Sequence, residues 1–161
     1  MIIKIYGVPM AKQSFRMGLS KNKKFVIKYQ DKKVVDWANG IKTQILSQLP
    51  KGYKLMTEPV MIKRLIYIFP ILKSLSKVKK AMAINLQMYK MSKPDVDNLQ
   101  KNLFDAFNQI VWRDDSQVCH INNLIKMHGA RPGVIIEVEE IDQFSLELSN
   151  KNILTVQGRF K

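Results

Sequence analysis

The sequence predicts a single α/β domain of the α+β kind, with a small mixed sheet and helices packed against it. A chain of 161 residues has the length of one domain and is too short for two comfortable ones. Its hydrophobic fraction of 46% is sufficient for a folded core. Segments with the alternation of strands and segments with the three- and four-residue spacing of helices follow one another along the chain.

The N-terminal third predicts two strands and a helix. The apolar run from Ile2 to Val8 indicates a first strand, closed by a Gly and Pro turn signal. The polar, basic stretch from Lys12 to Lys24 has few core-forming residues and predicts a loop, and Phe25–Tyr29 predicts a short strand. From Asp31 onward, apolar residues recur at helical spacing until Pro50 stops the pattern.

The middle of the chain predicts a central strand followed by two helices. Pro59–Phe69 is rich in Val, Ile and Tyr and indicates a strand inside the sheet. Ser76–Tyr89 has the composition of a basic helix. A further helix is expected to begin near Asp97. Its apolar residues fall on one face that must pack on the sheet, and they are Leu99, Leu103, Ala106, Phe107 and Ile110.

The C-terminal part predicts a hairpin and a tail. Ser116–Met127 and Val134–Ile141 alternate well enough to be its two strands. We therefore expect one folded domain over residues 1–141 and a tail over residues 142–161, which is a candidate dimer contact. The tail holds two apolar clusters separated by polar residues.

Composition points to a polyanionic partner. The formal net charge is +14, and lysine supplies most of the positive charge, as suits contact with phosphates regardless of sequence. Nucleic acid is favoured over a membrane, because no apolar run approaches the length of a spanning helix. The N-terminus lacks the features of a signal peptide, and Cys119 is the only cysteine, so a reducing cytoplasm is the expected setting.

Against this basic background, four aspartates lie close together in the sequence, namely Asp95, Asp97, Asp114 and Asp115. Carboxylates crowded together repel unless a cation compensates them, and carboxylate oxygens are ligands for Mg²⁺. The alternative is structural. Asp97 suits a helix N-cap with Gln100 completing a capping box, and Asp114 or Asp115 suits a turn before a strand. We interpret the group as a metal site surrounded by lysines.

The same residues carry a family resemblance. Their order is Lys93-Pro94-Asp95-x-Asp97-Asn98-Leu99-x-Lys101, then Asp105-Ala106, then Asp114-Asp115-x-Gln117-Val118 and a later Lys126. This pattern resembles the RusA family of Holliday junction resolvases. The resemblance is dense between Lys93 and Lys126 and loose outside that range.

The resemblance implies a site and an activity. Asp95, Asp97 and Asp115 would hold one or two Mg²⁺ ions, for which Mn²⁺ substitutes, and Lys101 would belong to the active site. It also implies a homodimer, and a sheet that carries the residues after Asp115 back past Asp95. Asp114 is ambiguous, and we leave Asp105 outside the site as a salt-bridging helix residue.

The expected function is that of a Mg²⁺-dependent endonuclease that resolves four-way DNA junctions by paired cuts, in the cytoplasm of a bacterium or from a prophage. One rival is a DNA-binding module without cleavage, and another is a nuclease for other branched DNA such as flaps or forks. Candidate contacts to the DNA backbone are Arg16, Lys77, Lys79 and Lys80, with a solvated charge run as the alternative.

Two further patterns carry less weight. His120 and His128 lack partners at metal-ligand spacing and are expected to be ordinary strand and turn residues. The tail segment 143–148, which reads Gln-Phe-Ser-Leu-Glu-Leu, resembles peptides that bind bacterial sliding clamps, with Phe144 in place of the usual leucine. Its period-two alternation favours the alternative, an edge strand or a dimer contact.

Overall fold

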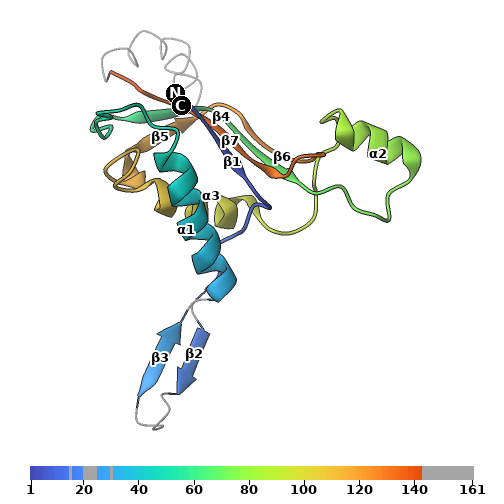
Figure 1. The fold of residues 1–161 in the computed structure, drawn as a ribbon, viewed down its shortest axis with the longest axis horizontal. Helices are drawn as coiled ribbons and strands as arrows, with labels where there is room; N and C mark the ends of the chain where they lie inside the picture. Colours follow the sequence, from blue (N-terminus) through green and yellow to red (C-terminus); the bar gives the residue numbers. More distant parts are fainter. Residues whose placement is uncertain (15, 20–24, 30, 143–161) are drawn as a thin grey trace, which may run out of the picture.

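The computed structural model describes residues 1–14, 16–19, 25–29 and 31–142, and it shows the expected mixed α+β fold (Figure 1). The clamp-like segment and most of the tail lie outside these residues. A main sheet is packed against helices, with a small two-stranded sheet beside it. Within the described ranges, no helix is long and apolar enough to span a membrane.

The main sheet is built around β4 (Val60–Phe69), which confirms the predicted central strand. On one side β4 pairs antiparallel with β7 (Gly133–Glu140), and β7 pairs antiparallel with β1 (Ile2–Tyr6). On its other side β4 pairs in parallel with two short strands in succession. These are β5 (Val118–Ile121) and β6 (Leu124–His128).

This topology corrects the predicted C-terminal hairpin. β6 and β7 do not pair with each other; each pairs with β4, from opposite sides. The two strands alternate as a hairpin would, but alternation reports which face is buried and says nothing about the partner strand. β4 is long and apolar, and it is paired along both edges. The segment between His128 and Gly133 connects β6 on one side of β4 to β7 on the other.

Two helices cover one side of the sheet. α1 (Lys32–Leu46) and α3 (Val96–Phe107) pack against each other, and α1 also contacts β1 (Figure 1). The apolar face of α3 is buried as predicted, and Leu99, Leu103 and Phe107 are fully enclosed with the side chains of the sheet. The core therefore fixes the axis of α3 relative to β4.

Two other predictions change. The expected loop from Lys12 to Lys24 contains β2 (Arg16–Leu19), which pairs with β3 (Val26–Tyr29) to form a hairpin away from the main sheet. The basic helix is shorter than predicted. It is α2 (Lys77–Ile84), and its end precedes Leu86, which has a positive φ of 56°.

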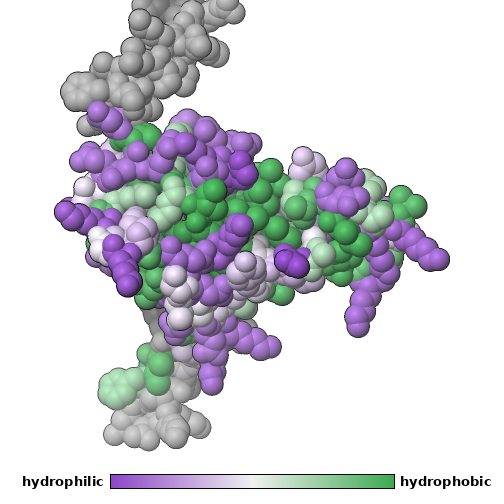
Figure 2. Space-filling model, turned by 45° about the horizontal axis from the view of Figure 1, so that its top comes forward, coloured by the Kyte–Doolittle hydropathy of each residue, from purple (hydrophilic) through white to green (hydrophobic). Residues whose placement is uncertain are grey.

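α2 stands at one end of the sheet and contacts β6 (Figure 1). Figure 2 shows hydrophobic surface continuing from the centre of the molecule onto this end, among hydrophilic side chains. Val78 and Ile84 of α2 contribute to the exposed apolar surface, beside the exposed Lys77 and Lys79. This helix therefore presents both charge and apolar area to solvent.

Candidate metal and nucleic-acid site

The N-terminal end of α3 carries the first two candidate carboxylates. Asp95 is the N-cap residue, in an extended conformation, and Asp97 lies in the first helical turn. The helix thus begins two residues ahead of the position that an Asp97 cap would require, and the predicted Asp97–Gln100 capping box is wrong. An N-cap aspartate usually accepts a hydrogen bond from the first turn. Within the described residues, Asp95 makes no such side-chain bond.

Both of these carboxylates face solvent. Oxygen ligands from one or two carboxylates suit Mg²⁺, which keeps several of its waters and takes others from a substrate phosphate. The donor set at this helix end therefore fits one hydrated divalent ion held by Asp95 and Asp97. Negative charge at a helix N-terminus is also favourable to the helix itself.

Lys101 lies one helical turn after Asp97 on an exposed stripe of α3, which consists of Asp97, Lys101 and Asp105. Its Nζ is 3.6 Å from Oδ2 of Asp97, and both side chains are 63% exposed. An exposed pair of this spacing contributes only about 0.3–0.5 kcal/mol to stability, so the lysine is free to meet another anion. Asp105, the next residue of the stripe, pairs with Lys12 at 2.5 Å, which agrees with leaving it outside the site.

Lys126 connects this end of α3 to the sheet. It sits on β6 beside Tyr67 of β4, and its Nζ donates to the carbonyl oxygens of Ser92 at 2.9 Å and Pro94 at 2.8 Å. The ammonium group thereby fixes the segment that leads into Asp95. Lys126 was part of the sequence pattern, but the pattern alone gave it no role.

Lys90 is a functional candidate that the sequence did not single out. Its backbone amide donates to the carbonyl of Lys126, its Nζ donates to Oγ of Ser92 at 2.6 Å, and the same Nζ lies 5.0 Å from the centre of the Phe69 ring. Burial and the neighbouring charge of Lys126 lower the pKa of Lys90. Two ammonium groups therefore lie close together next to the segment before Asp95.

The second pair of aspartates lies elsewhere. Asp114 is the N-cap of η1 (Asp115–Gln117), a single 3₁₀ turn that leads into β5. The side chain of Gln117 donates to the carbonyls of Met56 and Glu58, just ahead of β4, and Val118 pairs with Val60. Asp115 is thus held next to the start of β4.

Asp95 and Asp115 are at opposite ends of α3. Lys126, next to the segment before Asp95, is in register with Tyr67, whereas Val118 pairs with Val60. Seven residues of strand span about 23 Å, and a helix of the length of α3 spans about 18 Å. In Figure 1, β5 and β6 accordingly lie at opposite ends of the sheet. Over residues 1–14, 16–19, 25–29 and 31–142, no three His, Cys, Asp or Glu side chains come together to hold a metal.

The resemblance implied that the sheet carries the residues after Asp115 back past Asp95 and so brings Asp115 near it, and only the first part agrees with the structure. The residues after Asp115 do run back past Asp95, and they deliver Lys126 there. Asp115 itself stays behind at the other end of α3. A single chain provides two of the three expected ligands at one place.

Asp114 has a structural role. Its carboxylate accepts from the backbone amide of Ser116 at 3.0 Å, and Gln117 accepts from the amide of Asp114 in return, which completes a capping box. Hydrogen bonds with Ser116 lower the pKa of Asp114. This is the capping box predicted for the other acidic pair, found 17 residues further along the chain than the predicted Asp97 cap. Asp115 is partly exposed and lies beside it.

The predicted DNA contacts are only partly placed. Lys77 and Lys79 are exposed on α2, Lys80 is partly exposed, and α2 packs at the same end of the sheet as Lys126. Arg16 belongs to β2, and its side chain is outside the described residues. His120 is an exposed residue of β5, whereas His128 is buried and its Nδ1 lies 2.8 Å from the carbonyl of Pro70.

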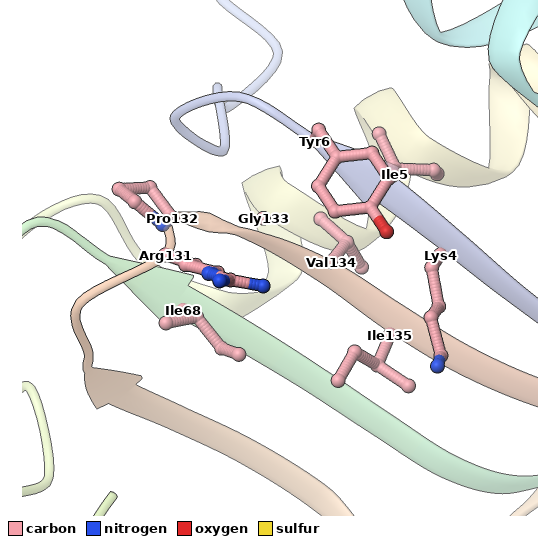
Figure 3. A pocket seen from close by; sticks show the side chains of 9 residues that line it. All are labelled: Lys4, Ile5, Tyr6, Ile68, Arg131, Pro132, Gly133, Val134 and Ile135. Carbon is pink, nitrogen blue, oxygen red and sulfur yellow. The ribbon is translucent and has the colours of Figure 1, made fainter. Parts of the chain in front are cut away.

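A cavity of 260 Å³ lies apart from the carboxylates, between β1, β7 and the end of β4 (Figure 3). Its wall is largely aliphatic, and the side chains of Lys4 and Arg131 are at its border. None of the four clustered aspartates lines it. The cavity is therefore not the centre that the carboxylates form.

Comparison with known proteins agrees with the residue pattern. The family described as endodeoxyribonuclease RusA matches residues 7–139. The chain belongs to this family. The match includes both acidic pairs, Lys101 and Lys126, and it supports assigning the chain to the nucleases. The chain is also similar to a Bacillus subtilis strain 168 protein printed as "Uncharacterized protein YqaN", with 35% identity over 89 residues. That match covers 54% of this chain and 61% of the relative.

Proposed function

We propose that the protein is a Mg²⁺-dependent endonuclease that resolves four-way DNA junctions, as a homodimer that makes one cut on each of two opposed strands. The observation that carries the proposal is the exposed N-terminal end of α3. There Asp95, which makes no capping hydrogen bond, and Asp97 lie beside Lys101, Lys126 and Lys90, in a chain of the RusA family.

Asp95 and Asp97 would hold the ion. A bound Mg²⁺ polarises a phosphate and lowers the pKa of a coordinated water so that the water can act as nucleophile. Because Asp95 has no capping bond to lose, its carboxylate can bind a ligand without weakening the helix. Lys126 keeps the segment before Asp95 in place, so the carboxylate is positioned before DNA arrives.

Lys101 would act on the reacting phosphate. Its ammonium is weakly paired and exposed on the same side as Asp97. A positive charge aimed at the phosphate stabilises the negative charge that develops as the phosphodiester breaks. Lys77 and Lys79 of α2 would hold the DNA backbone at the same end of the sheet, and such contacts to phosphate position the substrate without reading its sequence.

The test is cleavage of a fluorescent four-way junction by the purified full-length chain. We expect nicks at opposed strands in Mg²⁺ or Mn²⁺, none in EDTA, and none on a linear duplex of the same sequence. Tight junction binding without nicking in either metal would reject the enzyme in favour of a binding module. Faster cleavage of flaps or forks than of the junction would transfer the activity to another branched substrate.

A further inference from the structure

We propose that the ammonium groups of Lys90 and Lys126 form a second phosphate site, which binds the phosphate next to the one that is cut, on the same DNA strand. The inference rests on the proposed function and concerns how the site orients its substrate. It starts from two positive charges that the fold places side by side, next to the segment before Asp95.

Backbone pairing brings the two lysines together. The segment after α2 lies along β6, where Tyr89 forms an antiparallel bridge with Met127. One residue further on, the backbone amide of Lys90 donates to the carbonyl of Lys126 at 2.8 Å. In this register the two lysines are directly opposite each other, so their side chains leave the backbone on the same face, with Cβ atoms about 4.5–5.5 Å apart.

Both ammonium groups are fixed in place and still have donors to offer. Nζ of Lys126 donates to the carbonyls of Ser92 and Pro94, at 2.9 and 2.8 Å. Nζ of Lys90 donates to Oγ of Ser92 at 2.6 Å and lies 5.0 Å from the centre of the Phe69 ring. Because an ammonium group carries three N–H donors, each lysine retains at least one donor beyond these bonds for a further acceptor.

The pair is a local excess of positive charge. Among the residues that the structure describes, neither ammonium group forms an ion pair with a carboxylate. Like charges directly opposite each other on neighbouring strands are destabilising. Burial lowers the pKa of Lys90, and the charge of Lys126 lowers it further. An anion bound by both groups removes the repulsion, and a phosphate oxygen of the DNA accepts strong, charge-assisted hydrogen bonds from such donors.

The position of the pair selects the phosphate that it binds. Lys126 donates to the carbonyl of Pro94, the residue directly before Asp95, whereas Lys101 lies one turn beyond Asp97. The carboxylates therefore lie between the pair and Lys101. Neighbouring phosphates of one strand advance by about 3.4 Å along the axis of a duplex, so a strand with one phosphate at the carboxylates brings the next one toward the pair. Two bound phosphates fix the direction of the strand, which a single one does not.

Junctions that each carry one uncharged methylphosphonate test the proposal. Their binding to wild type and to Lys90→Met is measured by fluorescence anisotropy in EDTA, so the readout does not depend on cleavage. In the wild-type protein, neutralising the phosphate held by the pair should lower the affinity by about tenfold, as expected for loss of a hydrogen bond from a charged donor. Lys90→Met should lower the affinity for the unmodified junction by a similar factor. Neutralising that same phosphate should then have little further effect.

The other methylphosphonate positions are the matched control, because they should weaken wild type and Lys90→Met to the same extent. Ser92→Ala is the second variant, since it keeps both positive charges and removes the oxygen that fixes Lys90. Lys90→Met should reduce the slope of log affinity against log salt by about one, whereas Ser92→Ala should leave that slope unchanged. If no position is coupled to Lys90, or if Lys90→Met binds as wild type does, the lysine only supports the segment and the proposal is wrong.

Two further measurements separate this proposal from its neighbours. A free phosphate ion offers the same oxygens as a phosphodiester, and calorimetry should detect no binding of inorganic phosphate at millimolar concentration; tight binding that Lys90→Met abolishes would make the pair a site for a free ion instead. Nicks mapped in Mg²⁺ should fall at the phosphate next to the coupled one, and a more distant nick would overturn the proposal. If the wild-type protein binds the junction without nicking it, the proposed function fails, and the coupling still decides whether the pair binds a DNA phosphate.

Discussion

The two ends of α3 use the same side chain in opposite ways. At the C-terminal end, Asp114 caps η1, and the bonds of Gln117 fix the turn to the strand beside it. At the N-terminal end, Asp95 occupies a cap position without a capping bond, and a lysine holds the neighbouring backbone in its place. An aspartate that is well placed to cap but does not do so is a better ligand candidate than one that is already satisfied.

The largest expected effect comes from substituting Asp95 or Asp97. Asp95→Asn and Asp97→Asn should each slow junction cleavage in Mg²⁺ on the order of 10²–10³-fold, as for other groups that stabilise a transition state. Junction binding should stay intact or become tighter, because repulsion of the phosphates falls. Single-turnover cleavage and gel-shift titration measure the two quantities.

Asp105→Asn is the matched control, since it removes the same charge from the same stripe eight residues away from Asp97. It should cut at nearly the wild-type rate in a wild-type-like dimer. Near wild-type cleavage by Asp95→Asn or Asp97→Asn would make that residue a helix-terminal aspartate and nothing more.

Lys101→Ala should give the next largest effect. If the lysine stabilises charge on the phosphate, kcat falls by about tenfold or more while the affinity for the junction changes little. A mere ion pair with Asp97 would change stability by only a few tenths of a kcal/mol. Single-turnover rates at saturating enzyme separate these two roles, and an unchanged rate would reject the catalytic one.

Lys126→Met tests how the N-terminal end of α3 is held in place. The change removes hydrogen bonds from a charged donor to the carbonyls of Ser92 and Pro94, and such a loss costs about 1–3 kcal/mol of unfolding free energy. Urea denaturation measures the loss, and Lys126→Arg should recover part of it. A stable Lys126→Met protein with full activity would show that Asp95 needs no such support.

The smallest expected effect concerns Asp114, which caps η1. Because hydrogen bonds lower the folded-state pKa of Asp114, the stability that it contributes is fully present above its unfolded pKa. That contribution is lost as the pH falls through the lower, folded value. Comparing denaturation of wild type and Asp114→Asn should show a constant gap near neutral pH that closes below about pH 4. A gap independent of pH would mean that the carboxylate charge plays no part.

The sequence predicted those parts of the fold that depend on local periodicity. The buried face of α3 and the apolar run of β4 follow directly from spacing and composition. The sequence did not predict the partner strands of β6 and β7, because strand pairing joins residues far apart in the chain and alternation does not specify the partner. Of the β2–β3 hairpin, the short strand β3 was predicted, whereas β2 was missed because the stretch from Lys12 to Lys24 carries few core-forming side chains.

The same division applies to the site. Spacing along the chain identified Asp95, Asp97 and Lys101 as neighbours, since they lie within two turns of one helix. It gave no information on the distance to Asp115, which depends on where the chain turns between Phe107 and Val118. Lys90 was missed because its relation to Lys126 arises only when the segment after α2 lies along β6.

The proposed function requires that the N-terminal end of α3 binds a divalent metal. Mn²⁺ titration of the wild-type protein, Asp97→Asn and Asp105→Asn, followed by electron paramagnetic resonance, tests it most directly. We predict saturable binding to the wild-type protein and to Asp105→Asn, and loss of that binding in Asp97→Asn. Equal binding to all three proteins would contradict the account, because the ion would then be held elsewhere.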